Sequence, residues 1–122
     1  MEILKKRAKL REKVIEDARN WAKSLPFKAS VIMIGSYARG DFNLWSDVDI
    51  ILISDFKGSP LKRLEKIDYP PGFEVIPLTV HELTALLKKG DPLAKEAMFR
   101  GIILRDDFNI EKLKNTLENR KS

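Results

Sequence analysis

The chain has 122 residues, of which 43% are hydrophobic and 34% are charged, and it carries a net charge of +5. A chain of this length is typical of one domain, so we expect residues 1–122 to fold as a single unit. The lack of cysteine and the single histidine, His81, exclude disulfides, thiolate metal sites and histidine clusters, which leaves oxygen ligands for any metal. No apolar run approaches the ~20 residues of a membrane span, and we expect a cytoplasmic protein without a membrane segment.

The N-terminal segment predicts a long amphipathic helix. Over residues 2–24 apolar side chains recur at steps of three, four and seven, at Ile3, Leu10, Val14, Ala18 and Trp21. This spacing puts them on one side of a helix, which we expect to cover one face of a sheet with Trp21 as a core anchor. Residues 1–28 hold nine Lys or Arg against four Asp or Glu, which accounts for the whole net charge. We interpret the basic side as a solvated face, with contact to RNA or to an acidic partner as the alternatives.

Two short, β-branched and almost uninterrupted apolar runs, residues 30–34 and 50–53, predict buried strands. A third strand is expected over residues 73–78. Between the second and third strands, residues 54–72 are polar and rich in proline and glycine, which predicts an irregular connection with room for one short helix.

The C-terminal part of the chain alternates helix and strand signals. The expected elements are helices over residues 80–89, 92–100 and 110–120 and a short strand over residues 102–104. A capping box, Thr79-Val80-His81-Glu82, begins the first of these helices, and it places His81 in a first turn, where we expect a surface residue. Asp91 and Asn109 are the expected caps of the other two helices.

The connection between the first two strands carries the residues that point to chemistry. Gly35 ends the first strand and lets the backbone and a ligand approach closely, while Ser36 offers a hydroxyl and a backbone N–H to an anion. Asp47 and Asp49 stand two residues apart at the start of the second strand, so their side chains share a face and can hold a hard cation. Magnesium or manganese is the metal that such carboxylates favour.

Glu74 is the one charged residue of the third strand. A carboxylate between apolar strand residues is costly unless it is paired or metal-bound, and neighbouring strands would place it against Asp47 and Asp49. We therefore expect three carboxylates to converge. The alternative is that Glu74 lies on a solvent-facing edge strand, because Pro77 is a signal for an edge.

These residues form a longer motif, Gly35-Ser36-Tyr37-Ala38-Arg39-Gly40 followed by Ser46-Asp47-Val48-Asp49. The motif resembles the nucleotidyltransferase superfamily that includes DNA polymerase beta, and its fuller form resembles the minimal nucleotidyltransferase branch. The resemblance covers roughly residues 29–106. It implies an α/β fold, with a small mixed β-sheet and helices packed on one side.

The resemblance also implies a reaction, the metal-dependent transfer of a nucleoside monophosphate, with AMP from ATP as the expected case, to a hydroxyl. Asp47, Asp49 and Glu74 would be the catalytic, metal-binding residues and hold two magnesium or manganese ions, about 3.5 to 4 Å apart in sites of this kind. In the family the third ligand is commonly an aspartate on the following strand, and Glu74 matches that position. Gly35 and Ser36 would hold the β- and γ-phosphates.

Several residues of the motif have two interpretations. Arg39 is a candidate phosphate ligand, and an internal ion pair with Asp41 or Asp47 is the alternative. Tyr37 and Trp45 are candidates to stack on the base, although packing within the loop is the expected role for both.

The acceptor is less constrained. Minimal nucleotidyltransferases are often encoded beside a HEPN-domain protein, and the branch resembles enzymes that adenylylate a tyrosine of a HEPN ribonuclease toxin, which would make this chain an antitoxin. The alternatives are small-molecule modification, as in aminoglycoside nucleotidyltransferases, and an antitoxin that neutralises its partner by binding alone. RNA tailing is a further alternative because of the basic N-terminal helix.

Overall fold

The computed structural model describes the backbone of residues 2–121 and the side-chain environments of residues 2–115. The helices are α1 (Glu2–Ser24), α2 (Gly35–Arg39), α3 (Val80–Lys88), α4 (Pro92–Arg100) and α5 (Ile110–Lys121), with a 3-10 turn η1 (Pro60–Lys62). The strands are β1 (Ser30–Ile34), β2 (Val48–Ile53), β3 (Phe73–Leu78) and β4 (Ile102–Asp106). The expected α/β class is confirmed.

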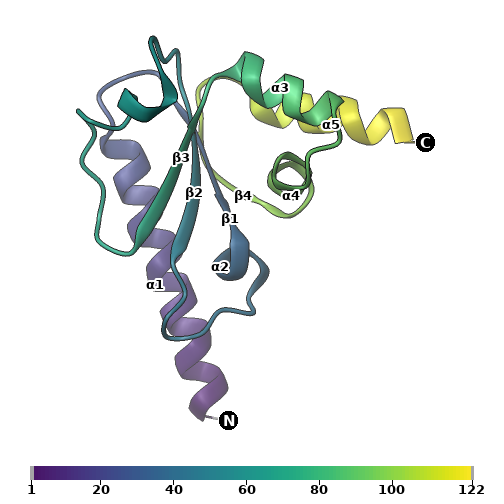
Figure 1. Ribbon diagram of the computed structural model, residues 1–122. Coiled ribbons are helices and arrows are strands. Elements are labelled where there is room, and N and C mark those ends of the chain that lie inside the picture. The colour runs from purple at the N-terminus through teal and green to yellow at the C-terminus, as the bar shows by residue number, and fades with distance from the viewer. Residues whose placement is uncertain (1, 122) are drawn as a thin grey trace.

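The described strands form one mixed sheet in the order β3-β2-β1-β4 (Figure 1). β1 pairs antiparallel with β2 and with β4, whereas β2 and β3 run parallel. The parallel pair requires a long crossover, and residues 54–72 supply it. The expected mixed sheet is therefore confirmed, and β3 is an edge strand.

Helices lie over both faces of the sheet, rather than on the one side that we expected. α1 packs with the face that contains Val31, Met33 and Ile50. α3, α4 and α5 pack on the opposite face, which contains Ile32 and Ile51. The physical reason is that β1 and β2 are apolar at consecutive positions, so both of their faces must be removed from water. Trp21 is 9% exposed in the first of these cores, as expected.

The start of α5 differs from the expectation. The carboxylate of Asp106 accepts hydrogen bonds from the N–H groups of Ile110 and Glu111, at 2.7 and 3.0 Å. Asn109 instead takes a left-handed backbone conformation, with φ at 61°. β4 extends to Asp106, beyond the expected strand, and this extension brings the carboxylate to the helix terminus.

Three arginines fasten α1 to the rest of the molecule. Near its C-terminal end, Arg105 of β4 donates to the carbonyl oxygens of Ala22, Leu25 and Phe27 at 2.8 to 2.9 Å. Nearer its N-terminal end, Arg11 donates to the carbonyls of Tyr37 and Ala38 at 2.7 and 2.8 Å, and Arg7 donates to that of Phe42 at 2.7 Å. Part of the basic side of α1 is therefore structural, and it holds the segment that follows β1.

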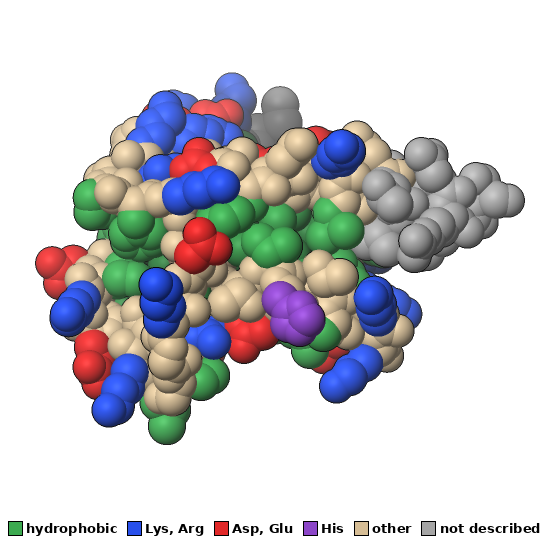
Figure 2. Space-filling view, turned by 90° about the horizontal axis from the view of Figure 1, so that it is seen from above, with side chains coloured by type: hydrophobic (Ala, Val, Ile, Leu, Met, Phe, Trp, Pro, Cys, Tyr) green, Lys and Arg blue, Asp and Glu red, His purple; other side chains and the backbone are tan. Residues whose placement is uncertain are grey.

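The end of the molecule that carries the 54–72 connection shows a strip of apolar side chains between basic ones (Figure 2). His81 is exposed, as expected. In the described part of the chain, the helices are all too short or too polar to cross a membrane.

Candidate active site

The turn at the end of β1 begins with Gly35. Its φ of 78° lies in the left-handed region that favours glycine, and α2 starts at this residue. Gly40 ends α2 in a second left-handed conformation and donates its N–H to the carbonyl of Ser36 at 2.7 Å. The glycines thus close one tight helical turn between β1 and the loop that leads to β2.

Gly35 is pressed against the carboxylate of Asp49. Ile34 pairs with Asp49 across β1 and β2, so the turn lies directly beside the start of β2. A Cβ added at Gly35 would lie 2.3 Å from Oδ2 of Asp49, closer than real Cβ atoms approach other heavy atoms. Only a residue without a side chain leaves room for this carboxylate.

Asp49 and Glu74 come together as expected. They are register partners in the parallel β2–β3 pair, and their side chains lie on the face of the sheet that α4 covers. Burial raises the pKa of Asp49, and the neighbouring carboxylate of Glu74 raises it further, with smaller contributions from Asp47 and Glu96. A raised pKa at a half-buried carboxylate is the electrostatic signature of like charges held together. Glu74 thus lies beside Asp49, as the first interpretation predicted, and it is also exposed on an edge strand, as the alternative predicted.

Asp47 lies differently from the other two expected ligands. It is exposed just before β2 and acts on Asp49 as a nearby charge. Within residues 2–115, no three acidic or histidine side chains converge into a ready metal-binding group. Glu74 and Asp47 both act on Asp49 as near charges, and the three-carboxylate metal site stays a prediction.

Glu96 of α4 is a fourth carboxylate, which the sequence analysis did not identify. Its Oε2 accepts a hydrogen bond from the N–H of Gly35 at 3.3 Å, and its Oε1 accepts one from Nη1 of Arg39 at 2.6 Å. Glu96 lies 47 residues beyond Asp49, inside a helix with an ordinary amphipathic pattern. The only signal in the sequence is a lone glutamate among the small apolar residues of α4, and the packing of α4 against β1 turns it towards the motif.

Arg39 forms internal ion pairs. Its guanidinium contacts Glu96 and, at 3.3 Å, the carboxylate of Asp41. One of the two alternatives for the ion pair, Asp41, is therefore observed, and Asp47 is not the partner. Both interactions leave Arg39 partly exposed at the mouth of the turn, so a phosphate could reach the same guanidinium.

The two aromatic residues of this region, Tyr37 and Trp45, have different environments. Tyr37 is buried and stacks on Phe42, with ring centroids 4.4 Å apart and planes 14° from parallel, so it packs within the loop as expected. Trp45 is 91% exposed, and the expectation that it packs within the loop is wrong. Hydrogen bonds within residues 43–46 fix the backbone of the turn and direct this side chain to solvent.

The donor set fits a divalent cation in its chemistry. Asp47, Asp49 and Glu74 offer only carboxylate oxygens, the ligands that magnesium and manganese prefer. Burial, and after it the nearby carboxylates, raises the pKa of Asp49. A cation bound among these carboxylates would relieve the repulsion between them.

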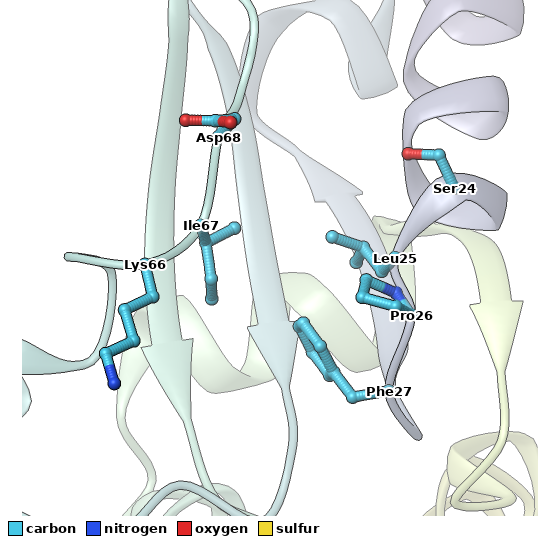
Figure 3. Close-up of a pocket in the computed structure, with 7 residues that line it drawn as sticks. All are labelled: Ser24, Leu25, Pro26, Phe27, Lys66, Ile67 and Asp68. Atoms are coloured by element: carbon cyan, nitrogen blue, oxygen red, sulfur yellow. The ribbon is translucent and has the colours of Figure 1, made fainter.

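The size of the cavities does not locate this site. A cavity of about 440 Å³ lies at the opposite end of β1, between the end of α1 and residues 66–68 (Figure 3). The side chains of Leu25, Pro26, Phe27 and Ile67 gather around it, while Lys66 points away. None of the expected site residues lines it. The carboxylates and the glycine turn are better guides, because the reaction requires charged groups rather than an enclosed apolar space.

A mixed sheet that sets an Asp–Glu pair beside a Gly-Ser turn defines a class of protein, the nucleotidyltransferases of the DNA polymerase beta type. Comparison with known families agrees with this class. The sequence model of the family described as "Nucleotidyltransferase domain" matches residues 8–117. The chain belongs to this family, and the resemblance stated from the motif is confirmed at that level.

Among solved structures, the chain is similar to a protein from Sulfolobus solfataricus that is described as a "putative nucleotidyltransferase". The two sequences are 18% identical, the similarity covers 84% of this chain and 86% of the other, and the TM-score is 0.52. At this identity the likeness supports the fold alone. A search of curated proteins gave no significant match.

Proposed function

We propose that the protein transfers a nucleoside monophosphate, AMP from ATP, to a hydroxyl of a protein acceptor. The observation that carries this proposal is the contact of Asp49 with Glu74 beside the Gly35 turn, within a nucleotidyltransferase domain. This arrangement gathers negative charge where a metal-bound triphosphate has to be held.

The residues divide the work as follows. Gly35 and Ser36 bind the β- and γ-phosphates, and Arg39 contributes a positive charge at the same turn. The acceptor oxygen attacks the α-phosphorus and forms a new P–O bond, the bond to the β-phosphate oxygen breaks, and pyrophosphate leaves in line. Glu74 is exposed beside Asp49, where it can accept the proton of the acceptor hydroxyl.

Asp47, Asp49 and Glu74 would hold two divalent ions, with magnesium or manganese as the metal. Such ions, when bound, supply the positive charge that offsets the triphosphate and lowers the pKa of the acceptor hydroxyl. The protein's part is to keep the carboxylates together, which the parallel pairing of β2 with β3 does.

We place the acceptor on a partner protein, as a tyrosine of a HEPN-domain toxin, so that the chain acts as an antitoxin in the cytoplasm. Support for a macromolecular acceptor comes from the open position of the site. Asp47 and Glu74 are both exposed to solvent. A tyrosine on a second protein can reach carboxylates in this position.

A second candidate is an antitoxin that neutralises its partner by contact alone. The exposed apolar side chains near the start of α1 and in the 43–46 turn favour it, because surfaces of this kind bind proteins. The two candidates differ in whether Asp49 is needed.

The deciding experiment is intact mass spectrometry of the HEPN-domain partner that this proposal requires, after incubation with the chain, ATP and magnesium. We expect the mass of one adenylyl group on a tyrosine, with none when Asp49→Asn replaces the wild type. Asp55→Asn is the matched control, because Asp55 is an exposed aspartate at the far end of β2. An unmodified partner whose toxicity is suppressed equally by the wild type and by Asp49→Asn would sink the catalytic proposal and leave the contact mechanism.

A further inference from the structure

Four large apolar side chains are exposed in two segments, the start of α1 and the turn before β2. They are Ile3, Leu4, Leu44 and Trp45, with exposed fractions of 75%, 69%, 82% and 91%. The first turns of α1 extend beyond the end of the sheet, on the side where the loop from α2 to β2 passes (Figure 1). Solvent exposure of several large apolar side chains at one end of a molecule marks an interaction surface.

A groove joins these two segments. It has a volume of about 290 Å³, and its lining residues are Ile3, Lys6, Arg7, Leu10, Phe42 and Leu44. Its walls are mainly apolar, and they come from α1 on one side and from the loop after α2 on the other. We call this surface the α1 groove; Leu4 and Trp45, which do not line it, follow its lining residues Ile3 and Leu44 directly in the sequence.

The α1 groove is held in shape by specific contacts. Arg7 donates to the carbonyl of Phe42 at 2.7 Å and lies over the Phe42 ring, 4.5 Å from its centroid. In the turn, Asn43 accepts from the N–H of Trp45 at 2.8 Å, and Ser46 accepts from the N–H of Asn43 at 2.9 Å. Because both walls are fixed before any partner arrives, little conformational entropy is lost when one binds.

The rim of the groove is positively charged. Lys5, Lys6 and Lys9 are exposed on the same turns of α1, around one carboxylate, Glu2, so the cluster keeps an excess of positive charge. Over the residues whose side chains the structure describes, none of the three lysines forms an ion pair with a carboxylate, although other basic residues of the chain do. An apolar groove with unpaired lysines on its rim is complementary to a segment with apolar anchors and acidic flanks.

We propose that the α1 groove docks an acidic segment of the protein acceptor, with aliphatic or aromatic anchors that enter between Ile3 and Leu44. This inference rests on the proposed function for the identity of the acceptor. A protein segment fits better than RNA because three aliphatic side chains, Ile3, Leu10 and Leu44, line the groove, whereas single-stranded RNA is held by stacking on aromatic side chains and by arginines free to contact phosphates. Arg7 is already bound to Phe42.

The position of the groove connects docking to catalysis. Trp45 precedes Asp47 by two residues, and Arg11 of α1 holds the carbonyls of Tyr37 and Ala38 in the catalytic turn. A segment bound in the α1 groove therefore lies at the end of the sheet where β2 begins, the end that also carries Asp47. Docking there raises the local concentration of the acceptor hydroxyl without contacting the nucleotide.

The test uses the full chain, a labelled acidic probe peptide and no nucleotide. The probe has three heptads with leucine at the first and fourth positions and glutamate elsewhere; its charge-reversed counterpart has lysine in place of glutamate. Binding is followed by anisotropy of the labelled peptide and by acrylamide quenching of tryptophan. Trp45 is the accessible tryptophan and Trp21 is buried, so quenching reports on the groove.

We expect the acidic probe to bind, to shift the Trp45 emission to the blue and to protect it from quenching, and the charge-reversed probe to do neither. The double variant Ile3→Ser/Leu44→Ser should weaken binding at least about tenfold, as expected for anchor residues of an interface. Leu61→Ser is the matched control, since Leu61 is 92% exposed in the 54–72 connection, away from the groove.

The charge contribution is tested separately. Lys5→Gln/Lys6→Gln/Lys9→Gln should weaken binding of the acidic probe, while Lys57→Gln/Lys88→Gln/Lys89→Gln, with the same net charge and exposed lysines elsewhere, should not. Equal binding by the groove variants and the wild type, or an unprotected Trp45, overturns the proposal. Protection of Trp45 by a ten-nucleotide single-stranded RNA, without protection by the acidic probe, overturns it in favour of nucleic acid.

A second measurement separates this inference from the proposed function. With the partner protein as acceptor, Ile3→Ser/Leu44→Ser should raise KM at least about tenfold and leave kcat within about twofold, because the groove does not contact the reacting atoms. Probe binding with no transfer to the partner removes the proposed function and leaves the docking surface. Transfer with a KM unchanged by the groove variant removes the docking surface and leaves the function.

Discussion

Two pairs of charged side chains, near opposite ends of β3, have opposite electrostatics. In one, Glu82 of α3 contacts Arg63, with Nη1 and Nη2 at 2.5 and 3.2 Å from its two oxygens, and also accepts from the N–H of Thr79. The Arg63 guanidinium lowers the pKa of Glu82 from 4.5 to about 2. In the other, Asp49 meets Glu74, and burial together with the second carboxylate raises the pKa of Asp49.

The opposite directions of the two pKa shifts show which pair stabilises the fold. Glu82 caps α3 and satisfies a nearly buried arginine, so its charge contributes to stability. Asp49 and Glu74 have no cation to pair with among the described residues, and their proximity costs stability in the absence of metal. Carboxylates kept together at such a cost are typical of a functional site.

The largest expected effect is on transfer. Asp49→Asn should lower kcat/KM by about three orders of magnitude or more, because it removes one of the charges that we propose to hold the metal and the triphosphate. Asp47→Asn should have an effect of the same order, and Glu82→Gln should leave transfer within a few fold. The measurement is the rate of pyrophosphate release with the partner as acceptor. Similar losses of transfer for Glu82→Gln and Asp49→Asn would show that both pairs act through the stability of the fold.

The next largest effect is on stability. Glu82→Gln should lower the free energy of unfolding at neutral pH by about 1 to 2 kcal/mol, because it weakens a charge-assisted contact and leaves the Arg63 guanidinium short of a partner. Urea denaturation followed by circular dichroism gives this value. The control is Glu65→Gln, an exposed glutamate of the 54–72 connection, for which we expect no significant change. If Glu65→Gln and Glu82→Gln have the same stability, the Arg63 pair is not structural.

A smaller effect concerns Glu96, which lies between the two kinds of carboxylate. It pairs with Arg39 but also contributes negative charge at Asp49. Glu96→Gln should release Arg39 and strengthen binding of magnesium ATP about threefold to tenfold, the range of a weakened surface-accessible ion pair. Calorimetry of nucleotide binding provides the test. Weaker binding in Glu96→Gln would instead assign Glu96 to the metal ligands.

The smallest expected effect is the dependence of stability on pH in metal-free buffer. The lowered pKa of Glu82 means that its contribution is complete above pH 4.5 and is lost as the pH falls towards 2. The raised pKa of Asp49 has the opposite sign, so its penalty is absent below pH 3.8, grows as the pH rises above 3.8 and is complete above the folded-state pKa.

Denaturation with a chelator at a series of pH values separates these two contributions. Asp49→Asn should be more stable than the wild type at neutral pH, Glu82→Gln should be less stable, and both differences should shrink on acidification. Addition of magnesium should reduce or reverse the advantage of Asp49→Asn, because only the wild type retains the full set of ligands. An Asp49→Asn protein that is less stable than the wild type without metal would contradict the repulsion.

The sequence predicted the strands and the contact of Asp49 with Glu74, because apolar runs locate buried strands and strand pairing brings their charged residues together. It did not identify Glu96, since only the packing of α4 on the sheet brings this residue to Gly35. Arg7 and Arg11 were interpreted as part of a solvated face, and a charged side chain gives no local sign that it will bind a distant carbonyl. The sequence pattern predicted the single elements, whereas it did not predict the contacts between elements that are remote in the sequence.

The crowding of Gly35 against Asp49 limits how this protein can change in evolution. A side chain at position 35 requires both a left-handed backbone and a displaced carboxylate, so even alanine there would move the Asp49 side chain. Gly58 and Gly72 also have positive φ, but no heavy atom lies within 4 Å of a Cβ added at either one. A lineage that drifts away from glycine at position 35 must therefore also move the Asp49 carboxylate, whereas drift at positions 58 and 72 affects only the local backbone.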